Sequence, residues 1–299
     1  MLLERSYPGR TLAVASLPDE QFISRALSGG AVLCAILYQS TGETRGKFDE
    51  KKFRANVRRV VPEQQGAMAL LDFEGSWMKF LEDEDVTSEA FRAGEAAYLD
   101  LLRIAREERP RARWSVYGVP AMRYFGSSTR GTTIAWDKAT NESRERGFEK
   151  GRRAQRLIDA CDWVGPTIYD PYLDSRNPTN RRAGQAHVYD KVALSVEMAK
   201  GKPVMPLVWH RVHDTNKTDG LTLLSNEEFV DGQIRPALAA GAAGVVWWGS
   251  DSFSTRNGTL QERRITEFEG IREGDAEAMK LRLRELHLEK LRAIEPVLR

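Results

Sequence analysis

The chain has 299 residues, enough for one large domain or two of ordinary size. Lysine and arginine number 45 against 43 aspartate and glutamate, a formal net charge of +2, so the chain lacks the basic excess of a typical nucleic-acid-binding protein. Apolar residues make up 41% of it, which excludes a disordered chain, and no apolar run reaches the 18 or more residues of a membrane span. We therefore predict neither a nucleic-acid nor a membrane partner.

The N-terminal segment carries Glu4, Arg5 and Pro8 where a secretion signal needs an apolar stretch, so no signal peptide is predicted. The two cysteines, Cys34 and Cys161, fit no metal-binding spacing and fall inside predicted strands. Buried free thiols are the favoured interpretation, and a disulfide is the alternative.

Short apolar segments alternate with longer amphipathic stretches, the pattern of parallel strands covered by helices. Strands are predicted at 11–16, 31–38, 67–73, 112–119, 163–169, 204–209 and 244–248. Helices are predicted at 48–60, 86–108, 140–160, 181–200 and 225–240. Ser225 and Glu228 form the capping-box pattern at the start of the last helix, and Gly241 stands where a helix-ending glycine belongs.

Long stretches without periodicity, at 120–140, 170–183 and 210–224, follow strands and not helices. In a (β/α) barrel the loops after the strands build the active-site face, so this asymmetry favours a TIM-like, distorted barrel of about seven parallel strands. An open doubly wound sheet is the alternative, but neither GxGxxG nor GxxxxGK[ST] occurs. We assign the barrel to 1–258 and an amphipathic helical extension, packed on the barrel or on a partner, to 259–299.

Two carboxylates end the buried strand at 67–73. Asp72 and Glu74 are two residues apart, so both project from one face at the carboxyl end of the strand. The charge of one carboxylate raises the pKa of the other, which keeps an acid protonated near neutral pH. The pair predicts a glycosidase-type site. The alternative is a pair of acids that caps a helix or binds arginine.

Aromatic residues crowd the ends of the other predicted strands. They are Trp114, Tyr117, Trp163, Tyr169, Trp209, Trp247 and Trp248. Sugar rings stack on aromatic planes, and tyrosine and tryptophan also supply hydrogen bonds, so the pattern predicts a carbohydrate cleft, with core packing as the alternative. Because neighbours along a strand alternate faces, at most one of Trp247 and Trp248 faces the barrel axis.

Five segments, in order over about residues 31–251, carry a resemblance to a known family. They are 35–38 (AILY), 70–77 (LLDFEGSW), 109–120 (RPRARWSVYGVP), 161–169 (CDWVGPTIY) and 224–251, which ends in GVVWWGSD. Together they resemble the hyaluronidases of the glycoside hydrolase class. The resemblance implies a distorted barrel and a retaining hydrolase in which the N-acetyl oxygen of the substrate is the nucleophile.

The resemblance also implies roles for individual residues. Glu74 would protonate the glycosidic oxygen and then activate water, and Asp72 would orient and polarise the acetamido group. Tyr169 would hydrogen-bond the same group, and Tyr117 would help to fix the sugar. Trp248 would form the wall that packs on the acetamido methyl. No cofactor is implied.

Further contacts to the substrate are predicted for Trp77, from the acidic motif, and for Trp209, at a strand end. Arg182, in the predicted loop 170–183, is predicted to bind a uronate carboxylate, with solvated surface as the alternative. Two residues separate Glu74 from Trp77 where the family motif has one, and the disulfides of the secreted animal enzymes have no matching cysteine pairs.

The four histidines are His187, His210, His213 and His287. The sequence His210-x-x-His213, followed by Asp214, suggests a metal site, but this spacing on a loop without a further ligand is weak evidence. We predict no metal ion.

These observations predict a glycosidase that cleaves a polysaccharide containing β-linked N-acetylhexosamine, such as hyaluronan or chondroitin, by a retaining, substrate-assisted mechanism. Such a glycan is extracellular, while the oligomeric state of the protein stays open. One alternative is a catalytically inactive glycan-binding or assembly protein on the same barrel. Another is a glycosidase for a glycan without an acetamido group.

Overall fold

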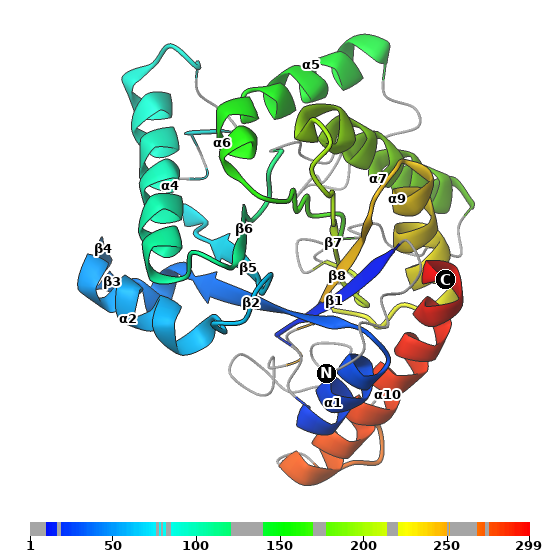
Figure 1. Ribbon diagram of the computed structural model, residues 1–299. Coiled ribbons are helices and arrows are strands. Elements are labelled where there is room, and N and C mark those ends of the chain that lie inside the picture. Colours follow the sequence, from blue (N-terminus) through cyan, green and yellow to red (C-terminus); the bar gives the residue numbers. More distant parts are fainter. Residues whose placement is uncertain are drawn as a thin grey trace.

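The computed structural model describes residues 10–16, 19–75, 78, 80–81, 85–120, 140–169, 178–213, 221–249, 251, 268–272 and 275–299. Its centre is a curled six-stranded parallel sheet with the strand order β6-β5-β2-β1-β8-β7 (Figure 1). The strands are β1 (Thr11–Ala15), β2 (Val32–Tyr38), β5 (Met68–Asp72), β6 (Arg113–Val116), β7 (Leu207–Val208) and β8 (Gly244–Trp248). This order follows the chain around a barrel, as the sequence predicted, and β1 lies beside β8.

The predicted strand at 163–169 forms no regular strand, which corrects the expected count of seven. It lies between the two edges of the sheet and makes single parallel bridges to both, from Gly165 to Tyr117 and from Thr167 to Leu207. Pro166 explains the interruption, because proline has no N–H to donate to a neighbouring strand. The segment nevertheless occupies the position of the missing barrel strand and carries Tyr169 at its carboxyl end.

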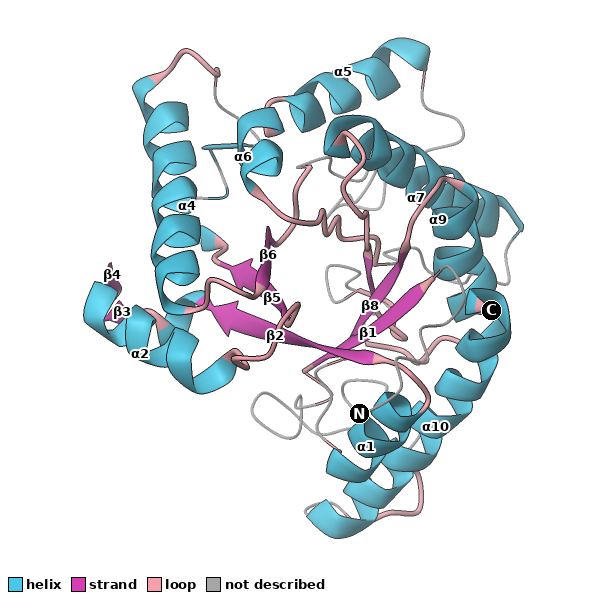
Figure 2. Cartoon of the chain, in the orientation of Figure 1, coloured by secondary structure: helices cyan, strands magenta, loops and turns pink. Residues whose placement is uncertain are grey.

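Helices cover the outside of the curled sheet (Figure 2). They are α1 (Glu20–Ser28), α2 (Glu50–Val60), α4 (Glu89–Glu108), α5 (Asn141–Arg152), α6 (Gln155–Ala160), α7 (Pro178–Ala199), α8 (Asn226–Phe229), α9 (Arg235–Ala239) and α10 (Ala276–Leu298). Among the described helices, none combines the length and the apolar character that a membrane span requires.

Several helix boundaries differ from the prediction. Helix α1, which the sequence analysis did not predict, buries Phe22 and Ala26 against the sheet. Helix α7 begins at Pro178, inside a predicted loop, because proline suits the first turn of a helix. The predicted helix 140–160 is divided into α5 and α6.

The predicted helix 225–240 contains a π-helical turn, Val230–Ile234, between α8 and α9. Its predicted capping box is confirmed: the backbone N–H of Glu228 donates to Ser225 Oγ at 3.1 Å, and that of Ser225 donates to Glu228 Oε2 at 2.6 Å. Gly241 follows α9 with a φ of 99°, as expected of a helix-ending glycine. A two-stranded hairpin of β3 (Glu43–Thr44) and β4 (Lys47–Phe48) was not predicted.

The buried side chains form two main layers. One lies between the sheet and the helices and includes Trp114 and Trp247, both fully buried. The other fills the inside of the curled sheet and includes Trp163 and Tyr169, with Trp248 packed against it. The two neighbouring tryptophans of β8 thus face opposite sides, as the alternation of side chains along a strand predicted. The buried thiols of Cys34 and Cys161 are both free.

Helix α10 closes the chain against the barrel. It begins at Ala276 after the N-cap Asp275, and buries Leu291, Ile294 and Leu298 in the outer layer of the core. It also packs on α1, where Arg284 Nη2 lies 2.9 Å from Asp19 Oδ2. Within the predicted extension, helix α10 therefore packs on the barrel of its own chain.

Candidate active site

The predicted acidic pair lies at the carboxyl end of β5. Asp72 is the last residue of the strand and is mostly buried, while Glu74 follows two residues later and is exposed. Burial of the Asp72 carboxyl, the negative charge of Glu74 and a hydrogen bond between the two raise the pKa of Asp72 to about 7. Two carboxyls hydrogen-bonded to each other must share a proton, so near neutral pH the pair holds one proton and one negative charge.

The backbone around this pair is held from two sides. The buried hydroxyl of Tyr98, from α4, donates a hydrogen bond to the carbonyl oxygen of Phe73, the residue between the two acids. Directly after Glu74, Gly75 has a φ of 61°, a left-handed conformation that glycine adopts without strain. The chain can therefore turn away immediately beyond the exposed carboxylate.

Tyr38 is a site residue that the sequence analysis did not assign. It ends β2 and is the direct cross-strand neighbour of Asp72. Its hydroxyl lies 2.7 Å from Ser16 Oγ and accepts a hydrogen bond of 3.2 Å from Trp248 Nε1. Burial, together with the charge of Asp72, raises the pKa of this hydroxyl, so it stays protonated. A tyrosine at the carboxyl end of a predicted strand was the signal that could have identified it.

Tyr169 and Tyr117 lie beside the same acid. Tyr169 is 6% exposed, and its hydroxyl forms a hydrogen bond with that of Tyr117. Burial raises the pKa of Tyr169 well above its usual range, and the neighbouring Tyr117 and Asp72 add to this effect. Tyr38 and Tyr169 thus both stay protonated beside the carboxyl of Asp72, and Tyr117 is hydrogen-bonded to Tyr169.

An aromatic cluster borders these tyrosines; we call Tyr169, Trp209 and Trp248 the aromatic wall. The centroids of the Trp209 and Trp248 rings are 4.8 Å apart at an interplanar angle of 69°, and those of Tyr169 and Trp248 are 5.5 Å apart. His213 stacks on Tyr169 at 5.5 Å with an interplanar angle of 16°. Such packing fixes the orientation of each ring, and Trp248 is the member that remains partly exposed.

Two further substrate contacts were predicted, Trp77 and Arg182, and the structure confirms neither. Trp77 lies outside the described residues, so the structure does not place it. Arg182 was expected in a loop, but it lies in α7 and is exposed. The nearby Arg181 pairs with Glu227, with 3.0 Å between Nη1 and Oε1. The structure thus brings together Asp72, Glu74, Tyr117, Tyr169, Trp209 and Trp248, and it does not bring Arg182 into contact with them.

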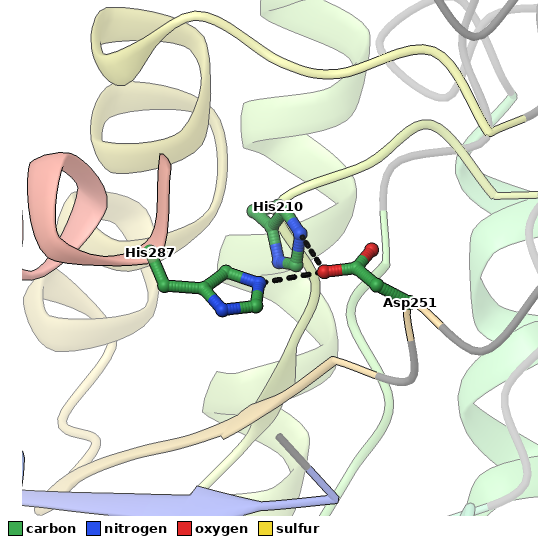
Figure 3. A group of neighbouring side chains, drawn as sticks. All are labelled: His210, Asp251 and His287. Atoms are coloured by element: carbon green, nitrogen blue, oxygen red, sulfur yellow. Dashed lines mark hydrogen bonds and ion pairs between the residues drawn. The ribbon is translucent and has the colours of Figure 1, made fainter. Parts of the chain in front are cut away.

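His210 and His213, whose spacing was weak evidence for a metal site, belong to different groups of side chains in the structure. His210 lies with Asp251 and His287 in a fully buried group (Figure 3). Asp251 Oδ2 is 3.3 Å from His210 Nε2 and 2.6 Å from His287 Nε2. The sequence did not reveal this group, because its members come from the end of β7, the segment after β8 and helix α10.

Two histidines and a carboxylate whose donor atoms lie within 4.8 Å of one another have the composition of a metal site. However, Trp247 Nε1 donates a hydrogen bond of 3.1 Å to His210 Nδ1, so a neutral His210 carries its proton on Nε2 and has no lone pair there for a metal. In addition, Arg211 Nε donates to Asp251 Oδ1 at 2.7 Å and already neutralises the carboxylate. The arrangement does not fit a cation.

No protein-family profile and no curated protein matches the chain. Among solved structures it is similar to bee venom hyaluronidase, at 17% sequence identity and a TM-score of 0.57, over 92% of this chain and 100% of that one. A second structure of the bee venom enzyme, in complex with a hyaluronic acid tetramer, matches at 17% identity and a TM-score of 0.56, over 86% of this chain and 96% of that one. At this identity the similarity shows the fold alone, a TIM-like barrel.

Proposed function

We propose that the protein is a retaining glycoside hydrolase that cleaves polysaccharides containing β-linked N-acetylhexosamine, with hyaluronan and chondroitin as the leading candidates. The observation that carries the proposal is the hydrogen-bonded pair of carboxyls, Asp72 and Glu74, at the carboxyl edge of the barrel beside the aromatic wall. Support for the substrate class comes from the fold, which is similar to that of a hyaluronidase solved with hyaluronic acid.

In this mechanism Glu74 is the acid and base. It is the exposed member of the pair, so its carboxyl is the one that a glycosidic oxygen can reach. As the bond between C1 and that oxygen breaks, Glu74 gives the oxygen a proton, and the acetamido oxygen of the same sugar bonds to C1. In the second step Glu74 removes a proton from water. The water oxygen attacks C1, and the bond between C1 and the acetamido oxygen breaks. The two displacements retain the configuration at C1.

Asp72 and the tyrosines would hold the acetamido group. The Asp72 carboxylate accepts a hydrogen bond from the acetamido N–H, which makes the carbonyl oxygen more nucleophilic. Tyr169 donates to that oxygen, Tyr117 fixes the sugar, and Trp248 packs against the methyl group. A nucleophile already attached to the sugar needs only the right orientation, and well-oriented intramolecular reactions gain roughly 7–11 kcal/mol.

The test is an assay for new reducing ends over a panel of polymers: hyaluronan, chondroitin, chitin and a glucan without acetamido groups. Glu74→Gln keeps the shape of the side chain and removes its acid function, so we expect hydrolysis to fall by roughly 10²–10⁴-fold. Glu63→Gln is the matched control, because Glu63 precedes β5 at the opposite end of the strand and is largely exposed. It should retain full activity.

Two outcomes would overturn the proposal. Full activity in Glu74→Gln would remove the assigned acid, and binding of a polymer without any hydrolysis would favour a glycan-binding protein. A thiazoline analogue of the cyclised intermediate separates the remaining alternative: it should inhibit competitively if the acetamido oxygen is the nucleophile. Hydrolysis of the glucan without inhibition by the thiazoline would contradict the substrate-assisted route.

A further inference from the structure

A buried polar cluster lies behind the aromatic wall, formed by His210, Arg211, Asp251 and His287; we call it the His–Asp cluster. Its side chains come from three segments far apart in the sequence: the exit of β7, the exit of β8 and the middle of α10 (Figure 3). None of the four residues is more than 5% exposed. Burying so many polar groups costs free energy unless each finds a partner, so the arrangement calls for an explanation.

Asp251 is the centre of the cluster. Its Oδ1 accepts from Arg211 Nε at 2.7 Å, and its Oδ2 lies 2.6 Å from His287 Nε2 and 3.3 Å from His210 Nε2. The Arg211 guanidinium also donates from Nη1 to the carbonyl oxygen of Leu221 at 3.0 Å. One carboxylate and one guanidinium make the cluster electrically neutral when both histidines are neutral, which is the favourable state in a dry interior.

The tautomers of the two histidines follow from their neighbours. His210 receives the Trp247 indole N–H at Nδ1, so its proton is on Nε2 and faces Asp251. The short contact from His287 Nε2 to Asp251 places a proton there as well, while His287 Nδ1 is buried without a hydrogen-bond partner in the described part of the chain. His287 thus donates a hydrogen bond to the carboxylate, whereas the N–H of His210 faces the carboxylate at the longer distance of 3.3 Å.

Three residues that form or contact the cluster lie close in sequence to a ring of the aromatic wall. His210 directly follows Trp209, Trp247 directly precedes Trp248, and Asp251 is three residues beyond Trp248. Because neighbouring side chains of a strand point to opposite faces, a group that holds the outward side chain also fixes the backbone that carries the inward one. The cluster therefore ties the ends of β7 and β8 to each other and to α10.

We propose that His287 is a positioning residue: by donating to Asp251 from α10, it holds the exits of β7 and β8 so that Trp209 and Trp248 keep the orientation that the site needs. The catalytic part of this inference rests on the proposed hydrolase function, whereas the structural part does not. Helix α10 would then help to position the site residues in addition to packing on the barrel.

The test compares three variants at the same buried position on α10. His287→Gln keeps an N–H donor at the place of Nε2, whereas His287→Leu removes the donor and His287→Asn is too short to carry it there. Hydrogen exchange is measured at the backbone amides of 207–212 and 244–249, without any substrate. We expect roughly 10- to 100-fold faster exchange in the Leu and Asn variants and near wild-type exchange in His287→Gln.

Leu291→Ala is the control for general loosening of α10, because Leu291 is 2% exposed on the same helix and belongs to the apolar core between sheet and helices. This variant should destabilise the whole protein. The ratio of exchange at the two strand exits to exchange in the rest of the sheet should stay close to the wild-type ratio. Equal exchange profiles in Leu291→Ala and His287→Leu would overturn the proposal, as would failure of His287→Gln to restore protection.

Kinetics of polymer cleavage add the functional readout. A misplaced wall tilts the sugar without removing its contacts, so His287→Leu should lower kcat by roughly 10- to 100-fold with KM changed little. An unchanged kcat in folded His287→Leu would overturn the positioning role. If the wild-type protein cleaves no polymer, the proposed hydrolase function fails, and the exchange experiment still decides the role of His287.

Discussion

Two aspartates at strand exits, Asp72 after β5 and Asp251 after β8, share a buried setting but differ in charge state. Burial and the adjacent Glu74 raise the pKa of Asp72 to about 7. Burial acts in the same direction on Asp251, but His210, His287 and Arg211 outweigh it and hold its pKa well below the usual range. The comparison shows that the charged neighbours decide whether a carboxyl in such a setting holds a proton or carries a fixed negative charge.

The largest effect on stability is expected from removing the charge of Asp251. Asp251→Asn leaves the fully buried Arg211 guanidinium without its counter-charge, and losing one partner of such a pair costs about 3–5 kcal/mol. Chemical denaturation measures the free energy of unfolding. Asp159→Asn is the control, because the exposed pair of Asp159 with Lys200 is worth at most about 1 kcal/mol. Similar losses in both variants would show that the cluster is not a buried charge pair.

Asp72→Asn should have the opposite effect on stability. Because the pKa of Asp72 is higher in the folded chain than in the unfolded chain, its contribution is fully present below about pH 4 and is lost as pH rises through about 7. Removing the charge should therefore stabilise the protein at pH 8 by about 1–4 kcal/mol, with little change at pH 4. Hydrolysis should fall by roughly 10²-fold or more, since the acetamido group loses its acceptor. Destabilisation at pH 8 would contradict the raised pKa.

The acidic pair was predictable from the sequence because its geometry is local: the spacing of Asp72 and Glu74 and the buried strand before them suffice. The tryptophans of β8 followed from the same alternation. The His–Asp cluster could not be predicted, since no sequence pattern brings the exits of β7 and β8 onto His287. Pro166 could be read from the sequence and explains why 163–169 forms no regular strand. The sequence could not show that this segment still occupies a strand position in the barrel, because that depends on the bridges it makes to the neighbouring strands.

Protonation of His210 in the His–Asp cluster should lower the stability of the protein as the pH falls. Burial lowers the pKa of His210 to about 4, an effect that Asp251 opposes and that Arg211 and His287 reinforce. Because this pKa is lower than in the unfolded chain, stability is full above about pH 6.5 and falls as pH decreases to about 4, by about 3 kcal/mol. Lys290, whose pKa burial lowers to about 8, faces the same region and titrates above this window, and the Glu228 and Glu289 carboxylates lie near its ammonium group.

The measurement is the free energy of unfolding between pH 4 and 7 for wild type and His210→Gln. The variant removes the titrating imidazole, so its stability should depend less steeply on pH in this window. An equal dependence in both proteins would assign the acid sensitivity to other groups.

The smallest effect concerns the turn after Glu74. Gly75→Ala places a side chain in a left-handed conformation, at a cost of about 1–2 kcal/mol. Gly66→Ala is a matched control, because Gly66 has a φ of 75° with open space around it and lies at the other end of β5. Both variants should lose similar stability, but only Gly75→Ala should also lower kcat. Equal activity in the two would show that the turn does not position Glu74.

The charge states of the two aspartates can be measured directly by NMR titration of protein labelled with ¹³C at the aspartate side-chain carboxyl carbon. The account predicts one resonance that titrates near pH 7 and disappears in Asp72→Asn, and a second, absent from Asp251→Asn, that stays in its ionised position down to the lowest pH at which the protein is folded. Titration of Asp72 near pH 4 would contradict the account, because the acidic pair would then hold no proton to give to a glycosidic bond at neutral pH.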